Sequence, residues 1–183
     1  AYILDLREKN SLMRYLATQK FHPYLLDWGE AEEEKSPLSL EDYVVKRLLP
    51  ALEHIYKKTG KPVALLGYCM GGLFALAAAR LKPNYVNALA LLATPWDFHA
   101  EETGNKALAA CDPKMLKKWV MSQDYVPKEQ IQMWFYMLHP WAIHRKFSRF
   151  GKWSLSSEEA QEFITVEDWL NDGVSMSSRA AWD

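Results

Sequence analysis

Apolar runs and amphipathic stretches alternate along the first half of the chain. Three short runs are predominantly apolar and have the length of strands: residues 24–28, 63–68 and 88–94. Three other stretches repeat apolar residues at every third or fourth position, as helices with one buried face do: residues 11–19, 39–58 and 70–81. Strands that are apolar on both sides occur mainly in parallel sheets between helices. The pattern therefore predicts an α/β fold, with a partial parallel sheet of three strands and helices on both faces.

Local signals refine the helix predicted over residues 39–58. Ser39 is expected to cap its start, with Asp42 as the return partner three residues later. Pro50 lies inside the helix and has no backbone N–H to donate, so we expect a kink there. Gly60 and Pro62 are expected to end the helix before the second apolar run.

The second half of the chain has a different pattern. After Pro95 no apolar run of strand type follows, and long aromatic side chains recur at helical spacing. Helices are expected over four segments: residues 105–121, 128–138, 140–149 and 157–171. We therefore predict a partial α/β core over residues 1–98 and a helical cap inserted over residues 99–183, with the domain incomplete at both ends.

Composition and charge exclude several classes of protein. The 22 basic and 23 acidic residues nearly cancel, so no basic excess indicates a nucleic-acid partner. No apolar stretch reaches the roughly 18 residues that a transmembrane helix needs. Cys69 and Cys111 are too few for a disulfide framework and lack metal-ligand spacing, so we expect no metal and a reduced, cytoplasmic setting. The eight Trp residues leave open a large core or an exposed apolar surface.

The candidate chemistry lies in Gly67-Tyr68-Cys69-Met70-Gly71-Gly72. This stretch has the spacing of a G-x-S-x-G nucleophile elbow, with Cys in place of Ser, between a predicted strand and a predicted helix. The tip of such an elbow is strained, and strand and helix approach closely there. Gly67 and Gly71 are expected to be the positions where the close approach leaves no room for a side chain. Gly72 is expected to reduce steric crowding in the next helical turn. We predict Cys69 as nucleophile and the Met70 N–H as an oxyanion donor.

The choice of a thiol narrows the reaction. A thiolate, favoured by the positive end of the following helix, exchanges readily with a thioester. Cys69 therefore favours acyl transfer from thioesters over simple ester hydrolysis. The alternative, that Cys69 is a small buried residue after a strand, is disfavoured by its flanking glycines, whereas Cys111 lacks such flanks and is interpreted as structural.

Several segments resemble one known family, in the same order along the chain: residues 2–6, 11–12, 24–29, 40–43, 66–72, 94–98 and 169–174. Together they resemble the N-terminal half of the catalytic domain of polyhydroxyalkanoate synthases, and the G-x-C-x-G-G box at 67–72 is the most specific of them. The resemblance implies polymerisation of (R)-3-hydroxyacyl-CoA into polyester with release of coenzyme A. It also implies a cytoplasmic homodimer on the surface of polyester granules, with coenzyme A present only as part of the substrate.

The family's catalytic triad is Cys–His–Asp, and the resemblance assigns only its Cys, to Cys69. The expected positions of the Asp and His lie after residue 183, and that of the first oxyanion donor before residue 1. Five histidines match none of the catalytic positions: His22, His54, His99, His139 and His144. His99 is the one expected nearest the mouth of the site, but an ordinary surface or packing role is favoured. Asp97 is interpreted as a turn former.

Two rival functions share this scaffold. A thioesterase or depolymerase would use the same elbow with water as the acyl acceptor, and the thiol argues against it without deciding. A granule-binding paralogue without catalysis would keep only the fold, which the intact elbow disfavours. In every case the 183-residue chain alone is expected to lack turnover, since the base and the second oxyanion donor are expected outside it.

Overall fold

The structure is a computed structural model that describes residues 2–29, 36–96, 113–138, 140–172 and 176–182. The chain forms two compact units, each described here by itself. The first contains Ala1–Glu33 and Tyr125–Met176, and the second contains Glu34–Asp124 and Ser177–Asp183. Of the predicted helix over 105–121, residues 105–112 lie outside the described residues, as do Asp97, His99, Cys111 and His139.

The second unit begins with one long helical stretch whose start is capped as predicted. It consists of α2 (Leu40–Asp42), the π-helical segment η3 (Tyr43–Leu48) and α3 (Leu49–Thr59). The Asp42 N–H donates to Ser39 Oγ over 3.1 Å, and the Ser39 N–H donates to Asp42 Oδ2 over 3.3 Å. This reciprocal pair satisfies two backbone donors that the first helical turn leaves without partners.

Pro50 disturbs this helix through a local change of helix type. The Leu49 N–H bonds to the carbonyl of Val44, five residues back, so the turn before Pro50 is wider than an α-helical turn. A proline offers no N–H to the carbonyl four residues earlier and its ring crowds that carbonyl, and a wider turn relieves both problems. Gly60 caps the end of this helix with a φ of 66°, in the left-handed region. Its N–H donates to the carbonyl oxygen of Tyr56 over 2.8 Å.

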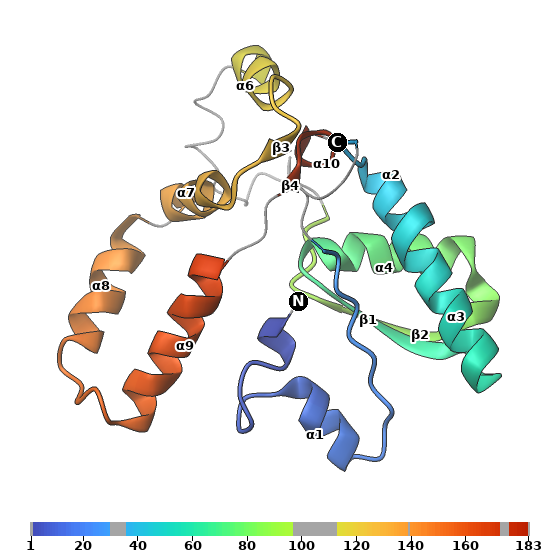
Figure 1. The fold of residues 1–183 in the computed structure, drawn as a ribbon, viewed down its shortest axis with the longest axis horizontal. Coiled ribbons are helices and arrows are strands. Elements are labelled where there is room, and N and C mark those ends of the chain that lie inside the picture. The colour runs from blue at the N-terminus through green and yellow to red at the C-terminus, as the bar shows by residue number, and fades with distance from the viewer. Residues whose placement is uncertain (1, 30–35, 97–112, 139, 173–175, 183) are drawn as a thin grey trace. The chain divides into compact units, whose positions relative to one another are not determined.

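Two parallel strands and the helix between them position the candidate site (Figure 1). The strand β1 (Val63–Tyr68) leads into α4 (Met70–Leu81), and a short 3₁₀ turn, η4 (Pro83–Tyr85), leads into β2 (Val86–Leu92). The two strands pair in parallel from Ala64 with Ala88 to Tyr68 with Leu92. Two of the three predicted strands are therefore confirmed, the later one as 86–92 rather than 88–94.

The third predicted strand, over residues 24–28, does not form. This segment has no regular structure, and Tyr24 and Leu25 remain exposed. A strand exists only where a neighbour accepts its hydrogen bonds, and no described strand pairs with this segment. The apolar run gave the right composition for a strand, but composition cannot supply the partner.

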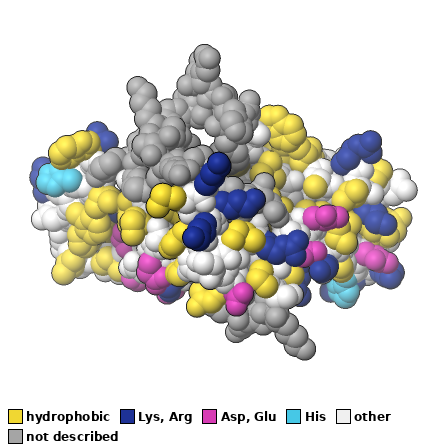
Figure 2. Space-filling view, turned by 90° about the horizontal axis from the view of Figure 1, so that it is seen from above, with side chains coloured by type: hydrophobic (Ala, Val, Ile, Leu, Met, Phe, Trp, Pro, Cys, Tyr) yellow, Lys and Arg dark blue, Asp and Glu magenta, His cyan; other side chains and the backbone are white. Residues whose placement is uncertain are grey.

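Helices cover the sheet on the side that buries the core of this unit. The helix α4 packs on both strands, and η3 packs on α4 through stacked rings of Tyr43 and Phe74, whose centroids are 5.8 Å apart. Buried side chains line this layer: Val44, Leu48, Leu52, Phe74, Ala75 and Ala78. Along β1 burial alternates, and Leu66 and Tyr68 are 39% and 51% exposed. Other apolar side chains also lie on the surface among charged ones (Figure 2).

In the first unit, the N-terminal segment is held to the helix α9 (Glu158–Asp172). The Tyr2 hydroxyl donates to Asp172 Oδ2 over 2.6 Å, and Lys9 pairs with Glu158 over 2.8 Å. The hydrogen bond to Asp172 raises the pKa of Tyr2 to about 12. These contacts explain why the first 33 residues group with the later helices in one compact unit rather than with the strands at 63–92.

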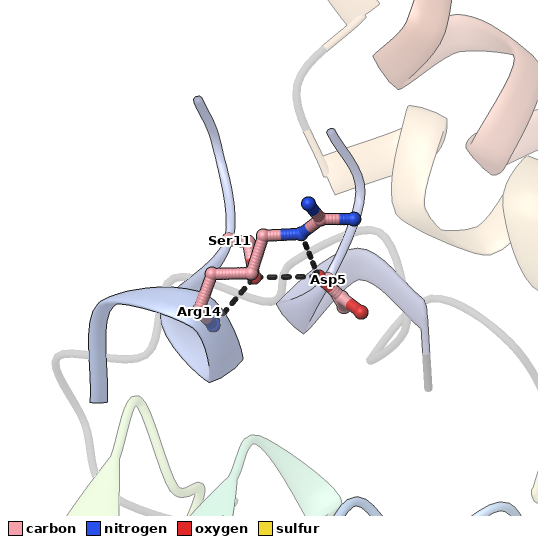
Figure 3. A network of polar contacts seen from close by, with 3 residues as sticks. All are labelled: Asp5, Ser11 and Arg14. Carbon is pink, nitrogen blue, oxygen red and sulfur yellow. Dashed lines mark hydrogen bonds and ion pairs between the residues drawn. The ribbon is translucent and has the colours of Figure 1, made fainter. Parts of the chain in front are cut away.

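The first helix of this unit starts at a small polar network (Figure 3). Residues Tyr2–Leu4 form the 3₁₀ turn η1, and α1 spans Leu12–Thr18. The Ser11 hydroxyl accepts from the Arg14 N–H over 2.9 Å and donates to Asp5 Oδ1 over 2.5 Å. That hydroxyl, and after it the guanidinium of Arg14, lowers the pKa of Asp5 below its ordinary value. The helix predicted over 11–19 is confirmed as Leu12–Thr18, with Ser11 as its N-cap.

The later segments are helical, as predicted. The first unit contains α7 (Lys128–Leu138), α8 (Pro140–Phe150) and α9, while α6 (Pro113–Val120) belongs to the second unit. Rings of Phe150 and Phe163 stack at 4.6 Å between α8 and α9. A half-buried ion pair joins Lys146 to Glu167 over 2.5 Å, and Lys146 Nζ lies 5.7 Å from the centroid of the Phe163 ring. The remaining elements are short: β3 (Tyr125–Val126), which pairs with β4 (Met176–Ser177), and α10 (Ser178–Trp182). Across the described residues, no helix is both long and apolar enough to cross a membrane.

Candidate active site

Cys69 is the single residue between β1 and α4. Its backbone has φ 53° and ψ −128°, a conformation that side chains other than glycine rarely adopt. Such backbone strain persists only where neighbouring contacts impose it, and strained residues are frequent at functional sites. The strained tip that the G-x-C-x-G pattern predicts is therefore present at Cys69, directly at the strand-to-helix junction.

Two backbone hydrogen bonds hold the Cys69 conformation. Its N–H donates to the carbonyl of Leu92, at the end of β2, over 2.8 Å, and its own carbonyl accepts from the Gly72 N–H over 2.9 Å. Cys69 is half-buried. No described residue forms a hydrogen bond with the thiol. The backbone, rather than a side-chain partner, thus fixes where the sulfur lies.

The close approach of strand and helix is made by Gly67 and Gly72. A Cβ on Gly67 would lie 2.5 Å from the Cα of Gly72 and 2.8 Å from the Cβ of Ala75. A Cβ on Gly72 would overlap the side chain of Thr94. Gly72 and Ala75 are one turn apart on the buried face of α4, which is the face that meets β1.

The predicted role of Gly71 as the second bare position is wrong. A Cβ on Gly71 would have no described atom within 4 Å. Its neighbour Gly72 is buried, and a step of one residue turns the helix by about 100°. The Cβ direction of Gly71 is therefore open among the described residues, although its carbonyl oxygen lies 2.6 Å from the position that a Cβ on Gly67 would take. The pair that must lack side chains is Gly67 and Gly72.

Met70 is the first residue of α4. The first N–H groups of a helix have no acceptor within it, and Cys69 provides no side-chain cap. The Met70 N–H is thus among the groups that can bind an anion at the helix start. Its role as an oxyanion donor remains a prediction.

The structure also reveals neighbours of the elbow that the sequence did not single out. Ala93, directly after β2, has a positive φ of 48°. Thr94 follows it and reaches Gly72, and its Oγ1 is buried without a hydrogen-bond partner among the described residues. Residues 94–98 carry part of the family resemblance, but no local pattern gives Ala93 or Thr94 a role at the elbow, since their contact with it depends on the pairing of β1 with β2.

The described residues contain three of the five histidines: His22, His54 and His144. His22 stacks on Tyr24 at 5.1 Å in the first unit, and His54 and His144 are exposed on α3 and α8. Among the described residues, no cluster of three or more His, Cys, Asp or Glu could hold a metal ion.

Comparison with known proteins agrees with this geometry. A family profile described as alpha/beta hydrolase fold matches residues 4–130, which include the elbow, the two strands and α4. The chain belongs to the α/β-hydrolase fold family.

The chain is also similar to proteins named poly(3-hydroxyalkanoate) polymerase subunit PhaC. It is 30% identical to the one from Haloferax mediterranei over 96% of this chain and 36% of that protein. It is 28% identical to the one from Haloarcula marismortui, over 98% of this chain and 38% of that protein. Against the one from Synechocystis sp. it is 28% identical over 93% of this chain and 47% of the relative. The chain thus spans less than half the length of these relatives, and the resemblance seen in its motifs is confirmed.

Proposed function

We propose that this chain carries the nucleophile of an acyltransferase that polymerises (R)-3-hydroxyacyl-CoA thioesters into polyhydroxyalkanoate. The observation that carries the proposal is the positive φ of Cys69 at the junction of β1 and α4. A thiol in that position suits an acyl-enzyme thioester. The names of the relatives support the substrate class.

The proposed reaction has two acyl transfers. In the first, the Cys69 thiolate attacks the carbonyl carbon of the acyl-CoA, the C–S bond to coenzyme A breaks, and the coenzyme A thiolate leaves. In the second, the 3-hydroxyl oxygen of another unit attacks the acyl group on Cys69, a base takes the hydroxyl proton, and the Cys69 thiolate is released. The polyester grows by one ester bond for each coenzyme A released. The Met70 N–H stabilises the oxyanion in both steps.

The base and its carboxylate partner are proposed to come from a His and an Asp outside this sequence, as the family resemblance implies. In consequence, the 183 residues alone would be without turnover. The wider setting belongs to the same proposal: a homodimer in the cytoplasm, acting at the surface of a polyester granule, with no nucleic-acid partner and no cofactor beyond the coenzyme A of its substrate.

Incubation of the full-length protein with 3-hydroxybutyryl-CoA tests the proposed function. The expected products are insoluble polyester and one coenzyme A per monomer consumed. Free 3-hydroxybutyrate with no polymer would instead establish a thioesterase, the alternative that the α/β-hydrolase family leaves open. A protein that binds polyester granules without releasing coenzyme A would be a paralogue without catalysis. Cys111→Ala, which removes the other thiol of the chain, is the matched control for the Cys69→Ala variant.

A further inference from the structure

Each of the two parallel strands is followed directly by a residue other than glycine that has a positive φ. Cys69 follows β1 with φ 53°, and Ala93 follows β2 with φ 48°. The two turns are linked, because the Cys69 N–H donates to the carbonyl of Leu92 over 2.8 Å. Backbone strain of this kind persists only where neighbouring contacts impose it. The turn at Ala93 therefore forms one structural unit with the elbow.

The turn at Ala93 carries Thr94 onto the first turn of α4. Thr94 Oγ1 is the atom nearest to the position that a Cβ on Gly72 would take, while its Cβ and Cγ2 are each 2.7 Å from that position. Gly72 in turn lies against Gly67 of β1. Gly72 is thus enclosed between Thr94 and the end of β1, with no room for a further methyl group.

The Thr94 oxygen contributes shape rather than a hydrogen bond. Oγ1 is buried and no described residue gives it a partner, which is an unfavourable state for a hydroxyl. A valine would avoid that cost, but it would place a methyl group where the smaller oxygen now lies against Gly72. In a packed interior an extra methyl group displaces its neighbours.

We propose that Thr94 is a positioning residue of the active site. Its hydroxyl oxygen, lying against Gly72, sets how closely the first turn of α4 approaches β1, and so places the Met70 N–H relative to the Cys69 sulfur. The inference rests on the proposed nucleophilic role of Cys69, and it adds a residue to which neither the sequence motif nor the comparisons give a role.

The test compares Thr94→Val with Thr94→Ser in the full-length protein. Valine keeps the size of threonine but replaces the oxygen, whereas serine keeps the oxygen. Thr94→Val should lower kcat for coenzyme A release from 3-hydroxybutyryl-CoA at least about tenfold with KM nearly unchanged, because a displaced donor acts mainly on the transition state. Thr94→Ser should stay within about threefold of wild type in kcat.

A second readout does not depend on polymerisation. The time course of Cys69 alkylation by iodoacetamide at one fixed pH reports whether the surroundings of the sulfur have changed. The alkylation profile of Thr94→Val should differ from that of wild type, and that of Thr94→Ser should match wild type. If wild type makes no polymer, the proposed function fails, but the alkylation comparison still decides the role of Thr94.

Two results would overturn the role of Thr94. One is a Thr94→Val protein with wild-type kcat and wild-type alkylation profile. The other is equal loss in Thr94→Val and Thr94→Ser, which would show that the oxygen that serine keeps is not enough to preserve the site. If Thr94→Val does not fold, Thr94→Ala takes its place, since it removes the oxygen without adding bulk. An alanine variant as active as the serine variant would then contradict the proposal.

Discussion

The backbone N–H of Cys69 donates a 2.8 Å hydrogen bond to the carbonyl oxygen of Leu92. This bond continues the parallel pairing of β1 with β2 by one residue, past Tyr68 and Leu92. It therefore joins the strained tip of the elbow to the neighbouring strand, and the sheet rather than the thiol side chain maintains the φ of 53° at Cys69.

The two adjacent glycines of the elbow should respond to alanine in opposite ways. Gly72→Ala should destabilise the protein by about 2 kcal/mol or more, because its Cβ would overlap Thr94. Gly71→Ala should be neutral or stabilising by up to about 1 kcal/mol, since alanine is the better helix former and no described atom opposes its Cβ. Urea unfolding of both variants measures the difference. Equal destabilisation of the two variants would show that the face of α4 that packs on β1 is not the one that carries Gly72.

The strain at Cys69 predicts an unusual order of stability among variants of the nucleophile. Cys69→Gly should be more stable than Cys69→Ala by about 1 kcal/mol, because glycine adopts a φ of 53° without steric cost. In an unstrained position the order would be reversed, since glycine loses more backbone entropy on folding. Both variants lack the Cys69 thiol and keep Cys111, so oxidation at position 69 does not affect the comparison of their thermal unfolding. A Cys69→Ala protein that is the more stable of the two would argue against strain at the elbow.

The cap of the helix at 40–59 should make stability depend on pH. The ammonium group of Lys46 and then the Ser39 N–H lower the pKa of Asp42 below its ordinary value. A carboxyl whose pKa is lower in the folded state stabilises the fold above its unfolded pKa, and this contribution disappears as pH falls through the folded pKa. The Tm of Asp42→Asn should therefore fall less than the Tm of wild type when the pH is lowered from 7 to 3. Parallel losses in the two proteins would mean that the cap carboxylate contributes nothing.

Local signals were enough to predict the segment from β1 to β2. Val63–Tyr68, the helix after Cys69 and the strand that follows are all encoded by apolar runs and a glycine-flanked turn. The segment at 24–28 has a similar apolar run. A strand also needs a neighbouring strand to pair with, and the sequence of the segment alone does not specify that neighbour. The choice between Gly71 and Gly72 failed for a related reason, because the motif gives spacing along the chain but not the rotation of α4 against β1. Thr94 was missed because its contact with Gly72 spans 22 residues and depends on the parallel register.

The most direct test of the account is to identify the residue that carries the acyl group. The full-length protein is mixed briefly with radiolabelled 3-hydroxybutyryl-CoA, quenched with acid and digested, and the labelled peptide is sequenced. The label should appear on the peptide that contains Cys69, disappear in Cys69→Ala and persist in Cys111→Ala. Label on Cys111, or sustained release of coenzyme A by Cys69→Ala, would contradict the assignment of Cys69 as the nucleophile.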